Sequence, residues 1–368
     1  MPFLIDAHHI GARQTGNETW IRNVIRELAQ ISPGANLVFA STEAGSARLA
    51  AITGQRPEIL PSSSVRRLAW DLPRIVRRTR ADAVLLQYTM PLRVSSPCVV
   101  MVHDTSFEQP EAASWMPSRT VWRIRRSVRR SAWHAAVLLA PSQFTKDCLV
   151  REYGCPPERI AVAPNAVDPE LAEHLAKPLD GPRERDVFKV LAVGNVLPRK
   201  NLVTLATAVQ NLRNEGIDAT LRIVGSVPAG SDGLESHLRA LLGAAVTFSG
   251  YVDDAQLARE YQTANALGFP SVFEGFGIPA LEAMYAGTPV VVSDSTSLPE
   301  VVGDAGVCVP PTDVAAWTTA LRKVRDDHRW SEQLSALGRR RSRDFSWRAS
   351  AESVLAALRR AAAGARES

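Results

Sequence analysis

The most informative stretch of this chain reads Phe273-Glu274-Gly275-Phe276-Gly277-Ile278-Pro279-Ala280-Leu281-Glu282-Ala283-Met284-Tyr285. Gly275 directly follows Glu274, and Gly277 stands two residues further on. Pro279 then begins a helical pattern that contains Glu282. Proline is tolerated in the first turn of a helix, because the N–H that it lacks would have no partner there. The stretch therefore predicts the end of a strand, a glycine loop and the start of a helix.

This strand–loop–helix pattern has a chemical use. Free backbone N–H groups at a helix N-terminus, together with the helix dipole, favour a phosphate group, and glycines let a ligand come close to the backbone. Glu274 at the loop mouth and Glu282 about one turn into the helix can each accept hydrogen bonds from hydroxyls. A sugar joined to a ribose through a diphosphate presents its groups in that order. The alternative is a corner between strand and helix with surface glutamates, because a glycine pattern alone is weak evidence.

Length and composition indicate a globular protein with two domains. The chain has 368 residues, of which 45% are hydrophobic and 22% charged, which suits two α/β domains with ample cores. No apolar run approaches the roughly 20 residues of a transmembrane helix, and residues 1–10 show no secretory signal. The four cysteines have neither metal spacing nor a disulfide framework, so we expect reduced thiols in a cytoplasmic protein.

Apolar strand-like runs alternate with helical patterns along the whole chain, which predicts parallel sheets with crossover helices. The strands predicted in the first half are Phe3–Ala7, Asn36–Ala40, Ala83–Leu86, Cys98–Val102, Ala136–Ala140 and Ile160–Val162. Those predicted in the second half are Val187–Val193, Thr220–Val224, Val246–Phe248, Ala266–Phe269, Pro289–Val292 and Gly306–Val309. Residues 168–187, with three prolines and a glycine among polar residues, are predicted to link the two halves.

The stretch 273–285 resembles the E-x7-E region of retaining glycosyltransferases of family 4, including mannosyltransferase- and rhamnosyltransferase-like members. The resemblance continues upstream in residues 250–254 and downstream in residues 287–294 and 298–306. It implies the GT-B architecture, an α/β fold with two doubly wound Rossmann-like parallel-sheet domains facing a cleft.

The resemblance also implies a division into domains. Residues 1–170 would form the acceptor-side N-terminal domain, and residues 171–345 would form the domain that binds the nucleotide sugar. Residues 346–368 would form a terminal helix that packs back on the N-terminal domain.

A second candidate segment, Gly194 to Asn201, follows the first strand of the second half and precedes a helix. Arg199 and Lys200 therefore lie near a helix N-terminus, where a guanidinium fork and an ammonium point charge could hold a diphosphate. A solvated turn is the alternative. The segment resembles the donor-phosphate loop of the family, in which many members have a basic residue where this chain has Asn195.

A polar pair, His103-Asp104, ends the buried strand run 99–102. A single histidine after a strand is more often structural, but the resemblance implies a contact with the hydroxyls of the donor sugar. With Glu274, this pair makes up the predicted catalytic set. The resemblance further assigns donor binding to Gly16 in the N-terminal glycine loop, and to the backbone at Tyr251 and Val252, which would meet the base.

The remaining donor contacts implied by the resemblance come from the glycine loop itself, through Gly275, Phe276, Gly277 and Ile278. No Asp-x-Asp metal motif stands at a suitable strand end, and Asp253-Asp254 is predicted to cap a helix instead. We therefore expect neither a divalent metal nor a cofactor, the nucleotide-diphospho-sugar being the donor substrate.

The function implied by the resemblance is the retaining transfer of a hexose, chiefly mannose or a deoxyhexose, from a GDP-sugar. The acceptor would be a saccharide or a lipid-linked molecule in the synthesis of cell-surface polysaccharide or glycolipid. In this family the acceptor attacks from the side that the nucleotide leaves, and the diphosphate can take the acceptor's proton. A UDP-glucose-type donor, a nucleotide-sugar epimerase and a non-catalytic protein that binds sugar nucleotides are the alternatives.

Arginines cluster in the first half, and Arg119, Arg123, Arg126 and Arg130 follow helical spacing. Trp115, Trp122 and Trp133 are interleaved with them. A solvated helix face, an anionic membrane surface and nucleic acid are the three interpretations, the last without any recognition motif. The predicted location is therefore cytoplasmic, with a peripheral position at the inner membrane face as the second interpretation, and no nucleic-acid partner is predicted.

Overall fold

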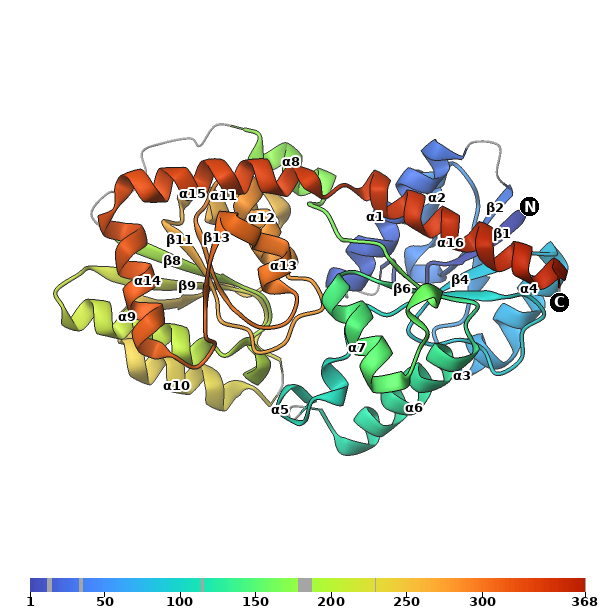
Figure 1. The fold of residues 1–368 in the computed structure, drawn as a ribbon, viewed down its shortest axis with the longest axis horizontal. Helices are drawn as coiled ribbons and strands as arrows, with labels where there is room; N and C mark the ends of the chain where they lie inside the picture. Colours follow the sequence, from blue (N-terminus) through green and yellow to red (C-terminus); the bar gives the residue numbers. More distant parts are fainter. Residues whose placement is uncertain (12–14, 33–35, 114–115, 178–186, 229, 368) are drawn as a thin grey trace. The chain divides into compact units, whose positions relative to one another are not determined.

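The computed structural model describes residues 1–11, 15–32, 36–113, 116–177, 187–228 and 230–367, and they form two compact α/β units (Figure 1). The first unit contains residues 1–108, 118–165 and 346–368, and the second contains residues 109–117 and 166–345. Each unit is a doubly wound parallel sheet, as the sequence predicted.

The chain visits the second unit at residues 109–117 and passes into it again at Ala166, whereas a single boundary at 170 was predicted. Asp168, in the predicted linker, accepts a hydrogen bond from the backbone N–H of Glu170 at 3.0 Å and so caps helix α8 (Pro169–Leu175). Leu171 and Leu175 of this helix are buried in the core of the second unit. The predicted linker is thus partly helical, and its residues 178–186 lie outside the described ones.

Within the described residues, the first unit has a seven-stranded sheet of order β3-β2-β1-β4-β5-β6-β7. The strands are β1 (Pro2–Asp6), β2 (Asn36–Thr42), β3 (Glu58–Leu60), β4 (Ala83–Gln87), β5 (Cys98–Met101), β6 (Val137–Ala140) and β7 (Ile160–Val162). All but β3 were predicted. That three-residue strand was missed because it begins with the charged Glu58 and has only two apolar residues, whereas the equally short β7 is apolar throughout.

Helices cover both faces of this sheet. They are α1 (Thr15–Ile31), α2 (Glu43–Thr53), α3 (Ser64–Arg66), α4 (Leu72–Thr79), α6 (Ser118–His134), α7 (Gln143–Tyr153) and α16 (Trp347–Glu367), with a π-helical turn η1 (Arg67–Asp71) and 3-10 turns η2 (Ser106–Glu108) and η3 (Pro157–Arg159). In α1, the residues Trp20, Val24 and Leu28 are fully buried along one stripe, which is the amphipathic pattern of a helix packed on a sheet.

The C-terminal helix α16 belongs to the first unit, where it packs along α1 and beside strands β4 to β7 (Figure 1). Its buried stripe includes Ala351, Val354 and Leu358. Arg366 at its end forms an ion pair with Asp82 at 3.1 Å. Residues far apart in the sequence therefore share one hydrophobic layer.

The second unit has a six-stranded sheet in its described part, of order β10-β9-β8-β11-β12-β13. The strands are β8 (Phe188–Val193), β9 (Ala219–Val224), β10 (Val246–Phe248), β11 (Ala266–Phe269), β12 (Val290–Ser293) and β13 (Gly306–Val309). The helices and 3-10 turns are α5 (Pro110–Ala113), α8, η4 (Pro198–Lys200), α9 (Leu202–Asn214), α10 (Asp232–Leu242), η5 (Gly243–Ala245), α11 (Asp254–Thr263), α12 (Ile278–Ala286), α13 (Leu298–Val302), η6 (Gly303–Ala305), α14 (Val314–Asp326), α15 (His328–Arg341) and η7 (Ser342–Asp344).

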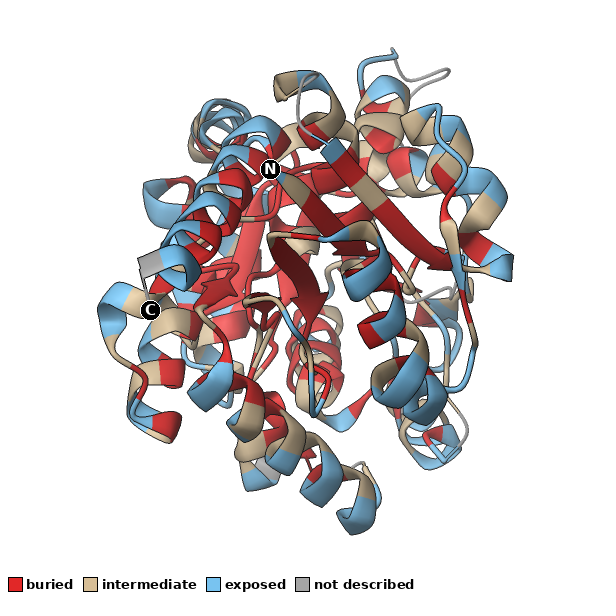
Figure 2. Ribbon diagram, turned by 90° about the vertical axis from the view of Figure 1, so that its right-hand side faces the viewer, coloured by how far each residue is buried: buried red, intermediate tan, exposed pale blue. Residues whose placement is uncertain are grey.

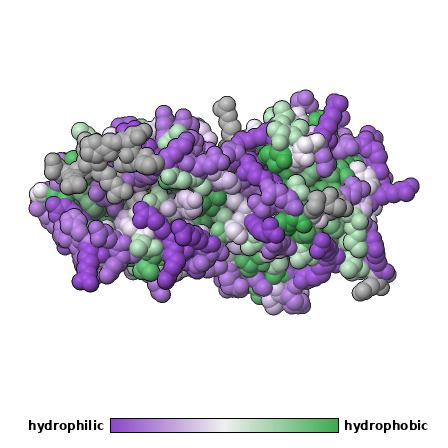
Figure 3. Space-filling view, turned by 90° about the horizontal axis from the view of Figure 1, so that it is seen from above, coloured by the Kyte–Doolittle hydropathy of each residue, from purple (hydrophilic) through white to green (hydrophobic). Residues whose placement is uncertain are grey.

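Two hydrophobic layers sandwich this second sheet. One layer includes Trp317 of α14 and Leu205 of α9, and the other includes Tyr261 of α11 and Met284 of α12. Figure 2 shows the corresponding distribution for the first unit, which faces the viewer there, with buried strands and helices whose outer sides are exposed. The face seen in Figure 3 carries mostly hydrophilic side chains with apolar ones scattered among them.

Because all strands of each sheet are parallel, their carboxyl ends meet at one edge of that sheet, where ligands bind in open α/β folds. The predicted helix cap at Asp253 is confirmed, since its side chain accepts from the backbone N–H of Gln256 at 2.8 Å at the start of α11. In the described part of the chain, no helix combines the length and the apolar character that spanning a membrane requires.

Truncating Leu358 tests the packing of α16 on the first unit. Leu358→Ala removes a fully buried side chain and is expected to lower the free energy of unfolding by about 2–5 kcal/mol. Arg359→Ala, one residue along and exposed, is the matched control and should stay within about 0.5 kcal/mol of wild type. Equal melting temperatures for the two variants in calorimetry would contradict the buried position of Leu358.

Candidate functional site

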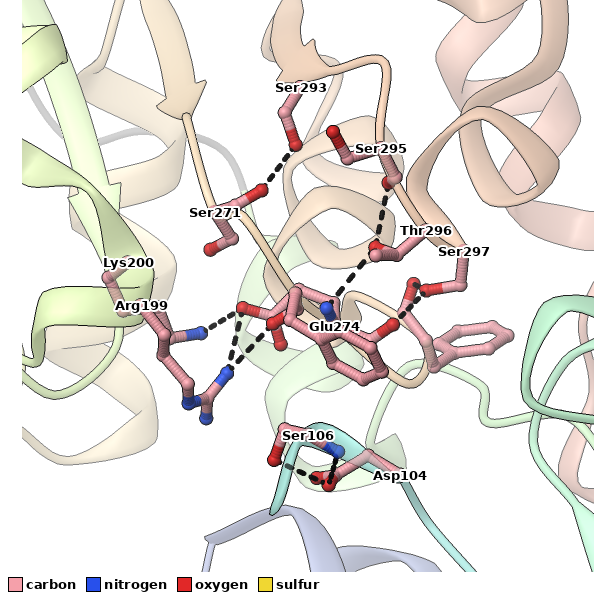
Figure 4. A network of polar contacts seen from close by, with 12 residues as sticks. Asp104, Ser106, Arg199, Lys200, Ser271, Glu274, Ser293, Ser295, Thr296 and Ser297 are labelled. Atoms are coloured by element: carbon pink, nitrogen blue, oxygen red, sulfur yellow. Dashed lines mark hydrogen bonds and ion pairs between the residues drawn. The ribbon is translucent and has the colours of Figure 1, made fainter. Parts of the chain in front are cut away.

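A partly buried ion network joins two loops of the second unit at the carboxyl ends of its strands (Figure 4). Lys200 Nζ lies 2.6 Å from Glu274 Oε1, and Arg199 Nη1 lies 3.3 Å from the same oxygen. Arg199 Nη1 also donates to the backbone carbonyl of Phe273 at 3.1 Å. The structure therefore brings together three residues that sequence reasoning had placed in two separate segments.

The two cations control the ionisation of the carboxylate between them. Burial alone would raise the pKa of Glu274, but the charges of Lys200 and then Arg199 lower it to about 2. Glu274 is therefore ionised at neutral pH, and the three side chains together carry one net positive charge.

Lys200 is held in place along its whole length. Only 9% of the residue is exposed, and its Nζ lies 4.7 Å from the centre of the Phe269 ring. The backbone of Gly194 faces the same side chain: a Cβ at this position would lie 3.2 Å from Lys200 Cε, and its φ of 130° disfavours other residues. Gly194 thus provides the space that the lysine occupies.

The loop that carries Glu274 is fixed by hydroxyl side chains after β12. Thr296 Oγ1 accepts from the backbone N–H of Glu274 at 3.2 Å (Figure 4). Ser297 Oγ lies 3.0 Å from the carbonyl oxygen of Glu274 and 2.9 Å from that of Phe276. Sequence reasoning missed these two residues, although they stand between the resembling segments 287–294 and 298–306.

The glycine loop turns sharply into α12, as its sequence predicted. Gly277 has a φ of 105°, and a Cβ there would lie 2.5 Å from Leu298 Cδ2. The helix begins at Ile278 with Pro279 in its first turn. Gly275 and Phe276 are buried beside Glu274, so the backbone of this loop is tightly packed.

Two further glycines, Gly225 and Gly250, bring backbone segments together next to Gly194. Gly225 follows β9, and its N–H donates to the carbonyl of Gly250 after β10 at 3.0 Å. A Cβ on Gly225 would lie only 2.2 Å from the carbonyl oxygen of Gly194. Next to this junction the Tyr251 side chain is 77% exposed, while Val252 is half-buried. These strand ends offer main-chain groups to a ligand.

Glu282 lies apart from the ion network, one turn into α12. It is buried, and its Oε2 accepts a hydrogen bond from the hydroxyl of Tyr261 at 2.7 Å. Burial raises the pKa of Glu282 to about 7, against the lowering effect of the Tyr261 hydrogen bond. The two glutamates of the motif therefore differ in charge, because only Glu274 has cationic partners.

The predicted residues of the first half lie in the first unit, at the carboxyl ends of its strands. His103 follows β5 and its Nε2 contacts Gln87 Oε1 at 2.6 Å. Asp104 Oδ1 accepts from the backbone N–H of Ser106 at 3.0 Å and from its hydroxyl at 2.8 Å, so it caps the turn that follows. Gly16 lies in the first turn of α1, and residues 12–14 before it lie outside the described part.

The same edge of the first sheet holds a charged cluster that sequence reasoning missed. Asp6, at the end of β1, is fully buried, forms an ion pair with Arg67 and accepts from His8 Nδ1 at 3.0 Å. Burial favours the neutral acid, but His8 and Arg67 hold the pKa of Asp6 well below its usual range. Asp6 and Arg67 are 61 positions apart, so no local pattern pointed to this pair.

Among the residues that the structure describes, no group of three or more histidine, cysteine, aspartate or glutamate side chains is placed to hold a metal ion.

Comparison with known proteins gives matches in both halves. Residues 15–171 match the family model "Glycosyltransferase Family 4", and residues 177–341 match "Glycosyl transferases group 1". The O-antigen chain mannosyltransferase B of Escherichia coli is 32% identical over 256 residues, 68% of this chain and 66% of that protein. The MMP alpha-(1->4)-mannosyltransferase of Mycolicibacterium hassiacum is 32% identical over 286 residues, 74% of this chain and 67% of that protein.

The match to each of these relatives thus spans about two thirds of the relative's length, 66% and 67%. A solved structure of sucrose-phosphate synthase from Thermosynechococcus elongatus superposes with a TM-score of 0.77. It covers 98% of both chains at 20% sequence identity, which is a likeness of fold.

Neutralising Glu282 tests its raised pKa. Since the folded-state pKa is about 7 and the ordinary value is 4.5, wild-type stability should be full below 4.5 and fall as pH rises through 7. Glu282→Gln keeps an acceptor for Tyr261 but cannot ionise, so it should gain stability over wild type by about 1–3 kcal/mol above neutral pH.

Thermal unfolding measured across this pH range checks the expectation. Glu300→Gln, at an exposed position, is the matched control and should show no such pH-dependent gain. A stability difference between Glu282→Gln and wild type that does not change with pH would contradict the assignment.

Proposed function

The chain belongs to the family 4-like glycosyltransferases of the GT-B fold, and on that premise we propose that it moves a hexose from a nucleotide-diphospho-sugar with retention of configuration. The proposed donor is GDP-mannose or a related GDP-deoxyhexose. The proposed acceptor is a saccharide or lipid-linked saccharide in polysaccharide or glycolipid synthesis. The mannosyltransferase relatives support the choice of mannose, and the O-antigen chain relative supports a saccharide acceptor.

The observation that carries this proposal is the network of Arg199, Lys200 and Glu274. A diphosphate leaving group gains negative charge as the glycosidic bond breaks, and fixed cations in a largely buried position stabilise that charge. Glu274 holds both cations in position and leaves one positive charge in excess for the phosphates. We propose that this pair of cations serves without a divalent metal.

In the proposed reaction, the bond between the anomeric carbon and the diphosphate oxygen breaks while the acceptor hydroxyl oxygen bonds to the same carbon on the same face. The proton of that hydroxyl passes to the departing diphosphate. The enzyme then acts by positioning and by stabilising charge, and no side chain has to accept the proton.

The other predicted site residues take positioning roles in this proposal. His103 is buried, and burial, together with His9, lowers its pKa to about 3, so it would meet a sugar hydroxyl as a neutral ring. Glu282 would contact hydroxyls of the ribose, and the main chain at Gly250 to Val252 would hold the base. Asp104 would shape the turn beside His103 through its two hydrogen bonds from Ser106.

We further propose that the outer face of α6 docks on an anionic membrane surface. This face presents Arg119, Trp122, Arg123, Arg126 and Trp133, with 62% and 59% of the two tryptophans exposed, and the helix contains no acidic residue. Guanidinium groups beside amphipathic rings suit the region of anionic headgroups.

Arg130, predicted on that same face, is turned inward and donates to the carbonyl of Leu92 at 2.7 Å. It therefore holds the loop after β4 rather than facing outward, and Arg129 is exposed instead. Trp115, predicted to accompany the arginines, lies outside the described residues.

A thermal-shift panel of GDP, UDP, ADP, TDP and their sugars tests the proposed donor. A ligand that binds only the folded state raises the melting temperature by mass action, so GDP and GDP-mannose should produce the largest shifts. A shift with UDP species alone would replace the GDP-sugar by a UDP-glucose-type donor. No shift with any nucleotide would overturn the proposed function.

The variant Glu274→Ala separates an enzyme from a binding protein in the same assay. Removing the carboxylate leaves both cations available to the phosphates, so the shift with the nucleoside diphosphate should persist, while sugar transfer, which needs the cations held in position, falls by at least about 100-fold. Glu300→Ala is the matched control and should keep wild-type transfer. Unchanged transfer in Glu274→Ala would remove Glu274 from the site.

Charge reversal on α6 tests the membrane proposal. The triple variant of Arg119, Arg123 and Arg126 to glutamate should lose at least about tenfold in co-sedimentation with phosphatidylglycerol vesicles, because each basic residue adds to the attraction. Reversal of the exposed Arg329, Arg340 and Arg359 is the matched control. An equal loss of vesicle binding in both triple variants would contradict a specific docking face. So would wild-type protein that binds neutral vesicles but not phosphatidylglycerol vesicles.

A further inference from the structure

Gln87 and His103 contact each other at the carboxyl ends of two neighbouring strands of the first unit. Gln87 is the last residue of β4 and pairs in register with Met101 of β5. His103 comes two residues after Met101, just beyond the end of β5. Both residues are buried, and His103 Nε2 lies 2.6 Å from Gln87 Oε1.

Aromatic rings hold the imidazole on its other sides. Trp20 of α1 packs edge to face at 5.3 Å between ring centres, with an interplanar angle of 80°. Tyr88 packs at 5.5 Å, and its φ of 57° places it in the left-handed region that a residue with a side chain seldom adopts. Such strain persists where the surrounding structure enforces it, often next to a functional site. The ring of His103 is therefore fixed in orientation.

The contact with Gln87 selects one tautomer of His103. A neutral imidazole carries a single N–H, on one nitrogen or the other. An oxygen atom at hydrogen-bond distance from Nε2 requires the hydrogen to be there, which leaves a lone pair on Nδ1. In the part of the chain that the structure describes, Nδ1 has no hydrogen-bond partner of its own.

Gln87 is not explained by stability alone. Its amide nitrogen is buried without a hydrogen-bond partner among the described residues. Burying an unpaired donor is destabilising, and an apolar side chain of similar length would avoid it. A glutamine at this place therefore points to a requirement for its oxygen.

We propose that Gln87 is a positioning residue for sugar transfer: it holds His103 as the Nε2–H tautomer, so that Nδ1 accepts a hydrogen bond from a substrate hydroxyl. The part of this inference that concerns substrate rests on the proposed function. The part that concerns the tautomer rests only on the contact between the two side chains.

Nitrogen NMR of histidine reads the tautomer directly. The full-length chain, labelled with 15N-histidine, is compared above neutral pH as wild type, Gln87→Met and Gln87→Glu, with His103→Phe to assign the signal. Wild type and Gln87→Glu, which keeps an oxygen at this position, should show hydrogen on Nε2. Gln87→Met should lose this preference. A wild-type His103 with hydrogen on Nδ1 would overturn the proposal.

Transfer kinetics with the donor identified by the nucleotide panel supply the second measurement. Gln87→Met should lower kcat by about tenfold while its melting temperature changes little, because the substitution removes one unpaired buried donor, the Gln87 amide nitrogen, and leaves another, His103 Nε2, without its acceptor. Gln87→Glu should recover most of kcat. Gln143→Met, at an exposed glutamine of the same unit, is the matched control.

These outcomes separate the two proposals. A wild-type protein without transferase activity would count against the proposed function, while the NMR result would still decide the tautomer. Normal kcat in Gln87→Met despite an altered tautomer would show that Gln87 has no positioning role. A fall in melting temperature parallel to the fall in kcat would indicate a structural role and overturn the proposal.

Discussion

The ion pair between Lys200 Nζ and Glu274 Oε1, 2.6 Å apart, is the interaction on which the candidate site depends. Taking both charges out of water is unfavourable unless the geometry is good and further hydrogen bonds are present. Here Arg199 shares the same carboxylate oxygen, and the backbone of the Glu274 loop is held by Thr296 and Ser297. The pair thus fixes two loops that are 74 positions apart in the sequence.

Close approach of backbones makes this arrangement possible. The space beside Lys200 exists because Gly194 has no side chain, and the neighbouring turn approaches because Gly225 has none. A Cβ at the first position would lie 3.2 Å from Lys200 Cε, a tight contact, and one at the second would collide with the carbonyl oxygen of Gly194. The glycines at these strand ends are therefore steric requirements of the site as well as points of access for a ligand.

Burial shifts the pKa of Glu274, Glu282 and His103 toward values that favour the neutral form, and the neighbouring groups decide the net shift. Glu274 is charged because two cations outweigh burial, which brings its pKa to about 2. Glu282, with only the hydroxyl of Tyr261, has its pKa raised to about 7 by burial. His103, against a neutral amide, has its pKa lowered to about 3 by burial and by His9. Similar depth in the protein thus yields one charged acid, one acid that titrates near neutral pH and one neutral base.

The sequence by itself determined the two doubly wound parallel sheets, the turn from Glu274 into α12 and the helix cap at Asp253, because hydrophobic period, glycine and proline act over a few neighbouring residues. It also singled out Arg199, Lys200 and Glu274. Only the tertiary structure decided that these three form one network, that Arg130 turns inward and that Gln87 contacts His103. Those contacts join residues that lie far apart in the chain, and their geometry depends on strand order and packing, which no local pattern encodes.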